Sequence, residues 1–200
     1  MKKEIVFDIG GVLFELDLKN SIPKLLNSTE ENGELLFQQW LFSKSVREFE
    51  SGKISYEDFF KNMVKEFNLK VDFETFTNEF KKVILGAFDE TEWLINTLKD
   101  DYNLYLLSNI TKIHWDMVNS YDYIKNNIKK PFISYLLGMA KPEIEIFELM
   151  IKEIGVKPEN ILYFDDNLSN VESALKSGLD AYHTIGIKEV IKKLKELKIL

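Results

Sequence analysis

Side chains suited to phosphate chemistry follow four short apolar segments of this 200-residue chain. In order along the chain they are Asp8, Ser108 with Asn109, Lys141, and Asp165 with Asp166. A carboxylate can attack phosphorus, and paired carboxylates supply the hard oxygen ligands that Mg²⁺ accepts beside a phosphate oxygen. A lysine among them keeps them ionised and compensates the charge of a bound phosphoryl group. The set therefore indicates phosphoryl transfer at a magnesium site.

The first of these segments reads EIVFDIGGVLFELD and places two glycines shortly after Asp8. Glycine has no Cβ, so the backbone at Gly10 and Gly11 can approach a ligand closely. The amides of this turn could then cradle the same phosphoryl oxygens that the lysine neutralises.

The pattern of apolar residues predicts the elements that must bring these side chains together. Short apolar runs predict strands over 4–9, 103–109, 131–138, 160–167 and 180–186. Apolar residues at three- and four-residue steps predict helices over 89–101, 141–155, 170–178 and 187–200. Alternating strands and helices are typical of an α/β fold with a doubly wound parallel sheet. The carboxyl ends of parallel strands lie on one edge, so we expect the polar side chains to converge there.

The stretch 18–88 breaks this alternation, because it contains several helical patterns and no convincing strand. Two of these helices are expected to begin at Ser55, in the capping box SYED, and at Asp72. We therefore expect an α/β core over 1–16 and 89–200 and an inserted helical cap over 17–88. The cap leaves and re-enters the sheet at the ligand-binding edge, so it is interpreted as a lid. A helical packing layer without a role in substrate choice is the alternative.

Composition restricts the classes of function. The net charge of −7 argues against nucleic-acid and anionic-membrane surfaces, which need clustered basic residues. No apolar run reaches the roughly 18–20 residues of a membrane span, and acidic residues interrupt the only segment like a secretion signal. The chain has no cysteine, so a reducing cytoplasm is the simplest compartment. Nothing in the pattern distinguishes a monomer from a homodimer.

Taken in order, the motifs resemble those of the haloacid dehalogenase-like hydrolases. FDIGGVL resembles the first motif of that family, LLSN the second, GMAKPEIEIF the third and YFDDN the fourth. The helical insertion between the first two motifs is similar to the first class of cap in the family. FESGKISYEDFF also resembles the cap of a subgroup of sugar-phosphate phosphatases.

The resemblance implies a magnesium-dependent phosphatase acting on a small phosphorylated metabolite, possible substrates including sugar phosphates. It implies that Asp8 attacks phosphorus and that water hydrolyses the resulting aspartyl-phosphate. Ser108 and Asn109 would bind the phosphoryl oxygens, and Lys141 would neutralise them. The resemblance also implies that Asp8, the Gly10 carbonyl and Asp166 hold Mg²⁺. Asp165 would then pair with Lys141. The roles of Asp165 and Asp166 could also be reversed.

Gly10 is the departure from the family pattern, because most phosphatases of the family carry an aspartate there. That aspartate protonates the leaving oxygen and later activates water, and such help is worth typically ~10²–10⁴-fold. A phosphatase could manage with an easily displaced leaving group, such as a sugar 1-phosphate or acyl phosphate provides. It could also recruit another acid from Glu15, Asp17 or the cap. The alternatives are a 2-haloacid dehalogenase, which needs no leaving-group acid, and a non-catalytic module that binds a phosphorylated ligand or a protein.

Overall fold

The computed structural model describes residues 4–26 and 32–200. The predicted core and cap segments also contain 1–3 and 27–31, which lie outside the described residues. In the described chain, five parallel strands form one sheet in the order β5-β4-β1-β6-β7. Their bounds are β1 (Glu4–Phe7), β4 (Asn103–Ser108), β5 (Ile128–Ile133), β6 (Ile161–Asp165) and β7 (Asp180–His183). This is the doubly wound parallel sheet that the sequence predicts.

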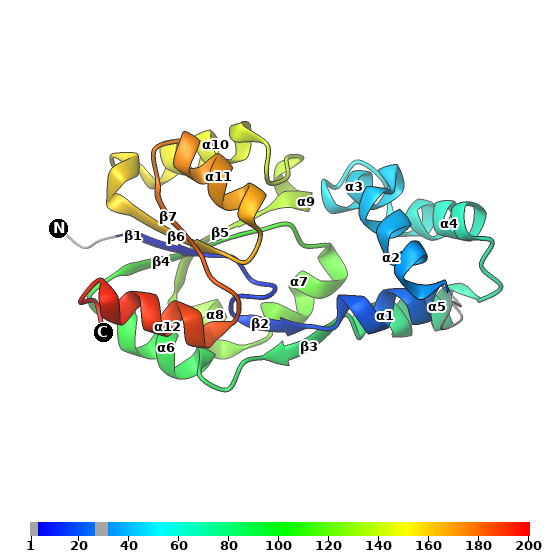
Figure 1. Ribbon diagram of the computed structural model, residues 1–200, viewed down its shortest axis with the longest axis horizontal. Coiled ribbons are helices and arrows are strands. Elements are labelled where there is room, and N and C mark those ends of the chain that lie inside the picture. Colours follow the sequence, from blue (N-terminus) through cyan, green and yellow to red (C-terminus); the bar gives the residue numbers. More distant parts are fainter. Residues whose placement is uncertain (1–3, 27–31) are drawn as a thin grey trace.

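Both faces of the sheet are buried, because successive residues of a strand point to opposite faces. In β1, Ile5 and Phe7 join one apolar cluster and Val6 joins the other. Helices cover each face (Figure 1). The first face carries α6 (Thr91–Leu98), α7 (Lys112–Val118), α8 (Asp122–Asn127) and α12 (Ile187–Glu196); the second carries α10 (Ile144–Ile154) and α11 (Leu168–Lys176). The four helices expected in the core are therefore confirmed, with α7 and α8 added.

The strand expected over 131–138 is the part of the core prediction that is wrong. The strand β5 begins earlier and ends at Ile133, and α9 (Ser134–Leu137) follows it. Because β5 pairs only with β4, it is an edge strand, and Lys129 and Lys130 are exposed on it. An edge strand need not be continuously apolar, so an apolar run does not mark its beginning. Gly138, with φ of +70°, ends the short helix.

Over its described residues, the inserted segment forms a bundle of five helices beside the carboxyl edge of the sheet (Figure 1). They are α1 (Leu18–Leu25), α2 (Gly33–Phe42), α3 (Lys44–Glu50), α4 (Tyr56–Phe67) and α5 (Phe73–Lys81). Ser55 accepts a hydrogen bond from the Asp58 amide and Asp72 from the Thr75 amide, as the capping prediction requires. An apolar cluster rich in aromatic rings fills the bundle.

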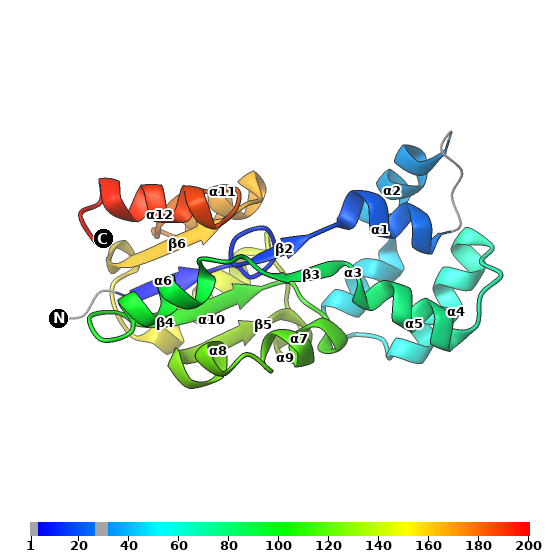
Figure 2. The ribbon, with the colours of Figure 1, turned by 90° about the horizontal axis from the view of Figure 1, so that it is seen from below.

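Two strands that the sequence does not predict join the bundle to the core. β2 (Phe14–Leu16) and β3 (Ile84–Ala87) pair antiparallel and run side by side toward the cap (Figure 2). The expectation of no strand over 18–88 is therefore wrong at β3. This strand has four residues and includes Gly86 with φ of +143°, so neither its length nor its composition marks it. A η1 turn (Pro158–Asn160) completes the elements of the described chain. Over residues 4–26 and 32–200, none of the helices combines the length and the apolar character that crossing a bilayer requires.

Candidate active site

Asp8 lies at the carboxyl end of β1, on the edge that faces the cap (Figure 1). Its amide donates to the carbonyl of Phe164 at 2.9 Å, which continues the ladder between β1 and β6 by one residue. Its Oδ1 accepts from the Ile9 amide at 2.7 Å, and only 7% of the residue is exposed. The sheet therefore holds the carboxylate in one orientation.

Lys141 is the cation of the site. Its Nζ lies 3.0 Å from Asp8 Oδ2 and 2.6 Å from Asp165 Oδ2, and it also donates to the Leu107 carbonyl at 3.0 Å. Burial alone would lower the pKa of this ammonium, but Asp165 and Asp8 outweigh burial and raise the pKa. Lys141 thus stays charged between two carboxylates.

Asp165 is fully engaged by protein groups. Its Oδ1 accepts from the Asn167 amide at 2.8 Å and from Asn170 Nδ2 at 3.0 Å. Its Oδ2 accepts from Lys141 and from the hydroxyl of Tyr163. A residue held by so many donors is suited to fixing the lysine, as the resemblance implies.

Asp166 follows at the same edge and lies against Gly11. A Cβ built on Gly11 would stand 2.0 Å from Asp166 Oδ2, and the φ of Gly11 is +71°. Any side chain at position 11 would therefore displace this carboxylate. Burial and the charge of Asp165 raise the pKa of Asp166.

Three carboxylates gather around the single lysine. Each of Asp8, Asp165 and Asp166 offers an oxygen, and these oxygens lie within 4.8 Å of one another. Burial, together with the charges of Asp165 and Asp166, raises the pKa of Asp8 to about 7 against the opposing charge of Lys141. A cluster of oxygen donors with excess negative charge is the chemistry that a hard divalent cation needs, so the residues present fit Mg²⁺.

The two glycines differ in what they offer a phosphate. The Gly11 amide donates to the Phe14 carbonyl at 2.8 Å. The cradle that the amides of this turn could form around phosphoryl oxygens stays a prediction. Gly10 has no Cβ in the space next to Leu16, whose Cδ1 would lie 2.7 Å from a Cβ built there.

The residues that follow β4 act on the site in two ways. Ser108 is buried, and its hydroxyl hydrogen-bonds to Asp8, which opposes the rise in the pKa of Asp8. Asn109 Nδ2 donates to the Lys141 carbonyl, and Asn109 Oδ1 accepts from the Lys141 amide, both at 2.8 Å. Asn109 therefore positions the lysine segment, and its contact with phosphoryl oxygens stays a prediction.

A cavity of about 130 Å³ lies between this edge and the cap. Its core lining includes Gly10, Ser108 and Asn109, and most of its cap lining is apolar. Glu50, the last residue of α3, is the exception. Sequence reasoning used the stretch FESGKISYEDFF only as a resemblance and did not single out Glu50, because a charge in a helical insertion has no intrinsic mark of facing the site.

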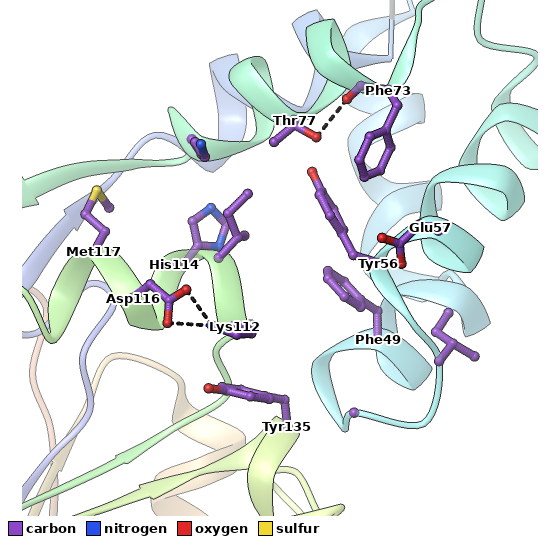
Figure 3. A pocket seen from close by; sticks show the side chains of 14 residues that line it. Phe49, Tyr56, Glu57, Phe73, Thr77, Lys112, His114, Asp116, Met117 and Tyr135 are labelled. Atoms are coloured by element: carbon purple, nitrogen blue, oxygen red, sulfur yellow. Dashed lines mark hydrogen bonds and ion pairs between the residues drawn. The ribbon is translucent and has the colours of Figure 1, made fainter.

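A larger cavity of about 770 Å³ opens farther out between cap and core. Figure 3 shows Phe49, Tyr56 and Phe73 on the cap side, with Lys112 and Tyr135 on the core side. The lining is mostly apolar, and it contains none of Gly10, Ser108 and Asn109, which line the smaller cavity. The chemistry therefore belongs to the smaller cavity, although the larger one adjoins it through shared residues.

The chain belongs to the haloacid dehalogenase-like hydrolases, since the model of that family matches residues 3–178. The resemblance expected from the four motifs is thus confirmed. The class is a hydrolase with a Rossmann-like core, in agreement with the parallel sheet and the site at its carboxyl edge.

Several members of that family are similar to this chain over most of its length. A D-ribitol-5-phosphate phosphatase of Bacteroides thetaiotaomicron is 28% identical over 192 residues, which cover 91% of each chain. A HAD-like hydrolase of Porphyromonas gingivalis has a solved structure with 27% identity, a TM-score of 0.84, and coverage of 99% of this chain and 98% of its own. A variant of a HAD family enzyme from Bacteroides thetaiotaomicron, solved with magnesium and inorganic phosphate, gives 25% identity, a TM-score of 0.81, and coverage of 92% and 94%.

Proposed function

We propose that this hydrolase is a magnesium-dependent phosphatase that cleaves a phosphate monoester of a small metabolite. The observation that carries the proposal is the contact of Lys141 with both Asp8 and Asp165 inside a cluster of three carboxylates. The name of the relative that acts on D-ribitol 5-phosphate supports sugar and polyol phosphates as the substrate class.

In the proposed mechanism, Asp8 attacks phosphorus and forms an aspartyl-phosphate, which water then hydrolyses. Lys141 and the Ser108 hydroxyl stabilise the negative charge of the transferring group. Asn109 holds the Lys141 backbone in place through two hydrogen bonds. The lysine stays beside the nucleophile because Asp165 anchors it.

Asp8, Asp166 and the Gly10 carbonyl would hold Mg²⁺. When bound, it neutralises phosphoryl oxygens and orients the phosphate. The engagement of both Asp165 oxygens by Lys141, Tyr163 and neighbouring amides favours Asp166 over Asp165 as the ligand.

The alternatives account for fewer of these features. A dehalogenase gains nothing from a cation-binding cluster, and a pure binding module gains nothing from a nucleophile beside a lysine. We also propose a lid role for the cap over 17–88, with the core over 1–16 and 89–200. A cytoplasmic location, suggested by the absence of cysteine, stays a prediction, as does the choice between monomer and homodimer.

The test is phosphate release from p-nitrophenyl phosphate, hexose 1- and 6-phosphates, pentitol phosphates and acyl phosphates, with Mg²⁺ or with EDTA. We expect release that needs Mg²⁺ and falls to background in Asp8→Asn. Asp101→Asn, an exposed carboxylate before β4, is the matched control and should keep full activity. Release that survives in Asp8→Asn, or no release from any of these substrates, would contradict the proposal.

A further inference from the structure

Glu50 is a carboxylate that the mechanism above does not use. It is only partly exposed, and it lines the small cavity together with Gly10 and Ser108. Among the residues described as lining this cavity, it is the only carboxylate. The cap therefore presents one acid to the edge where Asp8 attacks.

The position of Glu50 is fixed by the core as well as by the cap. Its carbonyl accepts from Ser134 Oγ at 2.6 Å, and Ser134 Oγ also accepts from the Ile110 amide at 3.1 Å. Two residues later, Gly52 lies so close to Tyr135 that a Cβ would stand 2.2 Å from the Tyr135 carbonyl oxygen. The end of α3 is thus docked onto the chain that follows β4 and β5.

The electrostatics of Glu50 suit proton transfer near neutral pH. Burial raises the pKa of Glu50 to about 7, and the charge of Lys141 opposes the rise. Both the acid and its conjugate base are then available in the range where a general acid works best.

The other acids considered from the sequence do not face the cavity. Glu15 is exposed on β2, and Asp17 accepts a hydrogen bond from the side chain of Asn20. Leu16, which lies between them, lines the cavity. Strand alternation in β2 therefore turns Glu15 away, and Asp17 lies beyond the end of that strand.

His114 also lines the cavity, but it is a poorer candidate for the general acid. Its Nε2 lies 2.9 Å from the Phe80 carbonyl and its Nδ1 lies 3.2 Å from Thr111 Oγ1. Burial lowers the pKa of this imidazole. Both ring nitrogens are thus occupied within the protein.

We propose that Glu50 is the general acid and base of this active site, and that the cap supplies the function missing at Gly10. The proposal rests on the phosphatase function proposed above. As Asp8 Oδ bonds to phosphorus, the bond from phosphorus to the leaving oxygen breaks, and that oxygen takes the proton of Glu50. In the second step, water attacks the aspartyl-phosphate, Glu50 takes its proton, and inorganic phosphate leaves. Asp8 is freed and Glu50 is protonated again.

This assignment widens the class of substrates. An enzyme without an acid is confined to leaving groups that depart easily, such as p-nitrophenolate and acyl groups. With Glu50 as the acid, unactivated alcohols can leave, so hexose 6-phosphates and polyol phosphates become substrates.

Single turnovers with enzyme in excess test the proposal. In Glu50→Gln, we expect release of the hexose from a hexose 6-phosphate to slow by ~10²–10⁴-fold. Release of p-nitrophenolate should stay within about tenfold of wild type, because that leaving group needs no proton. Under multiple turnovers the variant should show a burst of p-nitrophenolate, since hydrolysis of the aspartyl-phosphate has lost its base.

Controls separate a chemical role from a structural one. Glu48→Gln, which changes an acid on the same helix that pairs with Lys44, should leave both rates unchanged. Glu50→Asp should recover part of the hexose release. Wild type should lose rate at high pH, and Glu50→Gln should lack this loss. Equal slowing of both leaving groups, or no slowing, overturns the assignment of Glu50. If wild type released product from neither substrate, the phosphatase function itself would be overturned instead.

Discussion

Leu16 occupies the space that an acid at position 10 would need. A Cβ built on Gly10 lies 2.7 Å from Leu16 Cδ1, so an aspartate there would have to push this side chain aside. The loss of the usual acid is thus matched by a hydrophobic residue that closes the gap.

At the same scale, Glu50 makes stability depend on pH. Its pKa rises from 4.5 to about 7 in the folded protein because of burial, against the opposing charge of Lys141. The folded state then binds more protons than the unfolded chain between these pH values. The stability that protonated Glu50 contributes is complete below about pH 4.5 and is lost as the pH rises to about 7.

We therefore expect Glu50→Gln to melt at a higher temperature than wild type at pH 8, and the difference to shrink toward pH 4.5. Thermal unfolding across this range is the measurement. His114, the other titratable residue lining the cavity, is present in both proteins and cancels in the comparison. Glu48→Gln should parallel wild type at every pH, and a Glu50→Gln curve parallel to wild type would contradict the raised pKa.

At the scale of elements, the loop after α3 decides how the cap meets the core. Gly52 has φ of +68°, and the Tyr135 carbonyl occupies the place of its missing Cβ. Ser134, the first residue of α9, holds the Glu50 carbonyl beside it. The loop can dock only because position 52 lacks a side chain.

Gly52→Ala should therefore push the end of α3 away from α9. We expect a loss of more than ~1 kcal/mol in the free energy of unfolding, together with a lower kcat on hexose 6-phosphate. Gly155→Ala is the matched control, since Gly155 has φ of +76° but no atom within 4 Å of the added Cβ. Denaturant unfolding and steady-state kinetics measure both effects. Equal results for the two variants would show that backbone strain, and not the docking contact, is responsible.

At the scale of the whole molecule, three apolar clusters are separate. Two lie on opposite faces of the parallel sheet, and the third fills the cap. The cap and both described chain ends lie at opposite ends of the molecule (Figure 1). Disturbing the cap cluster should therefore affect the cap helices more than the sheet.

Phe59 is fully buried at the centre of the cap cluster, where its ring stacks on Phe49 with centroids 4.3 Å apart. Phe59→Ala should cost about 3–5 kcal/mol through the lost contacts and the cavity left behind. Hydrogen exchange should then speed up in α3, α4 and α5, while β1 and β4 keep their protection. Phe147→Ala, on one face of the sheet, is the control. It should speed up exchange in the sheet while the cap helices keep their protection. Equal loss of protection in sheet and cap would show that the molecule unfolds as one unit.

The sequence alone predicted most of the core elements and the convergence of the polar side chains at the carboxyl edge of the sheet. Asp8, Lys141 and Asp165 follow strongly apolar runs, and buried parallel strands must be apolar on both faces. Once the strands are parallel, their carboxyl ends meet, so the ion pairs among these residues could be expected without coordinates. The sequence did not predict the start of the edge strand β5 or the short strand β3, because short or exposed strands need not be apolar on both faces.

Only the tertiary structure decided which acid faces the leaving group. The sequence left open Glu15, Asp17 or an acid of the cap, and it did not single out Glu50, because all of these are carboxylates. Strand alternation in β2 places Leu16 on the cavity, and the docking of α3 on α9 brings Glu50 there. The pKa of Glu50 also depends on its burial where the cap meets the core. Contacts between cap and core are long-range, and no local pattern of residues encodes them.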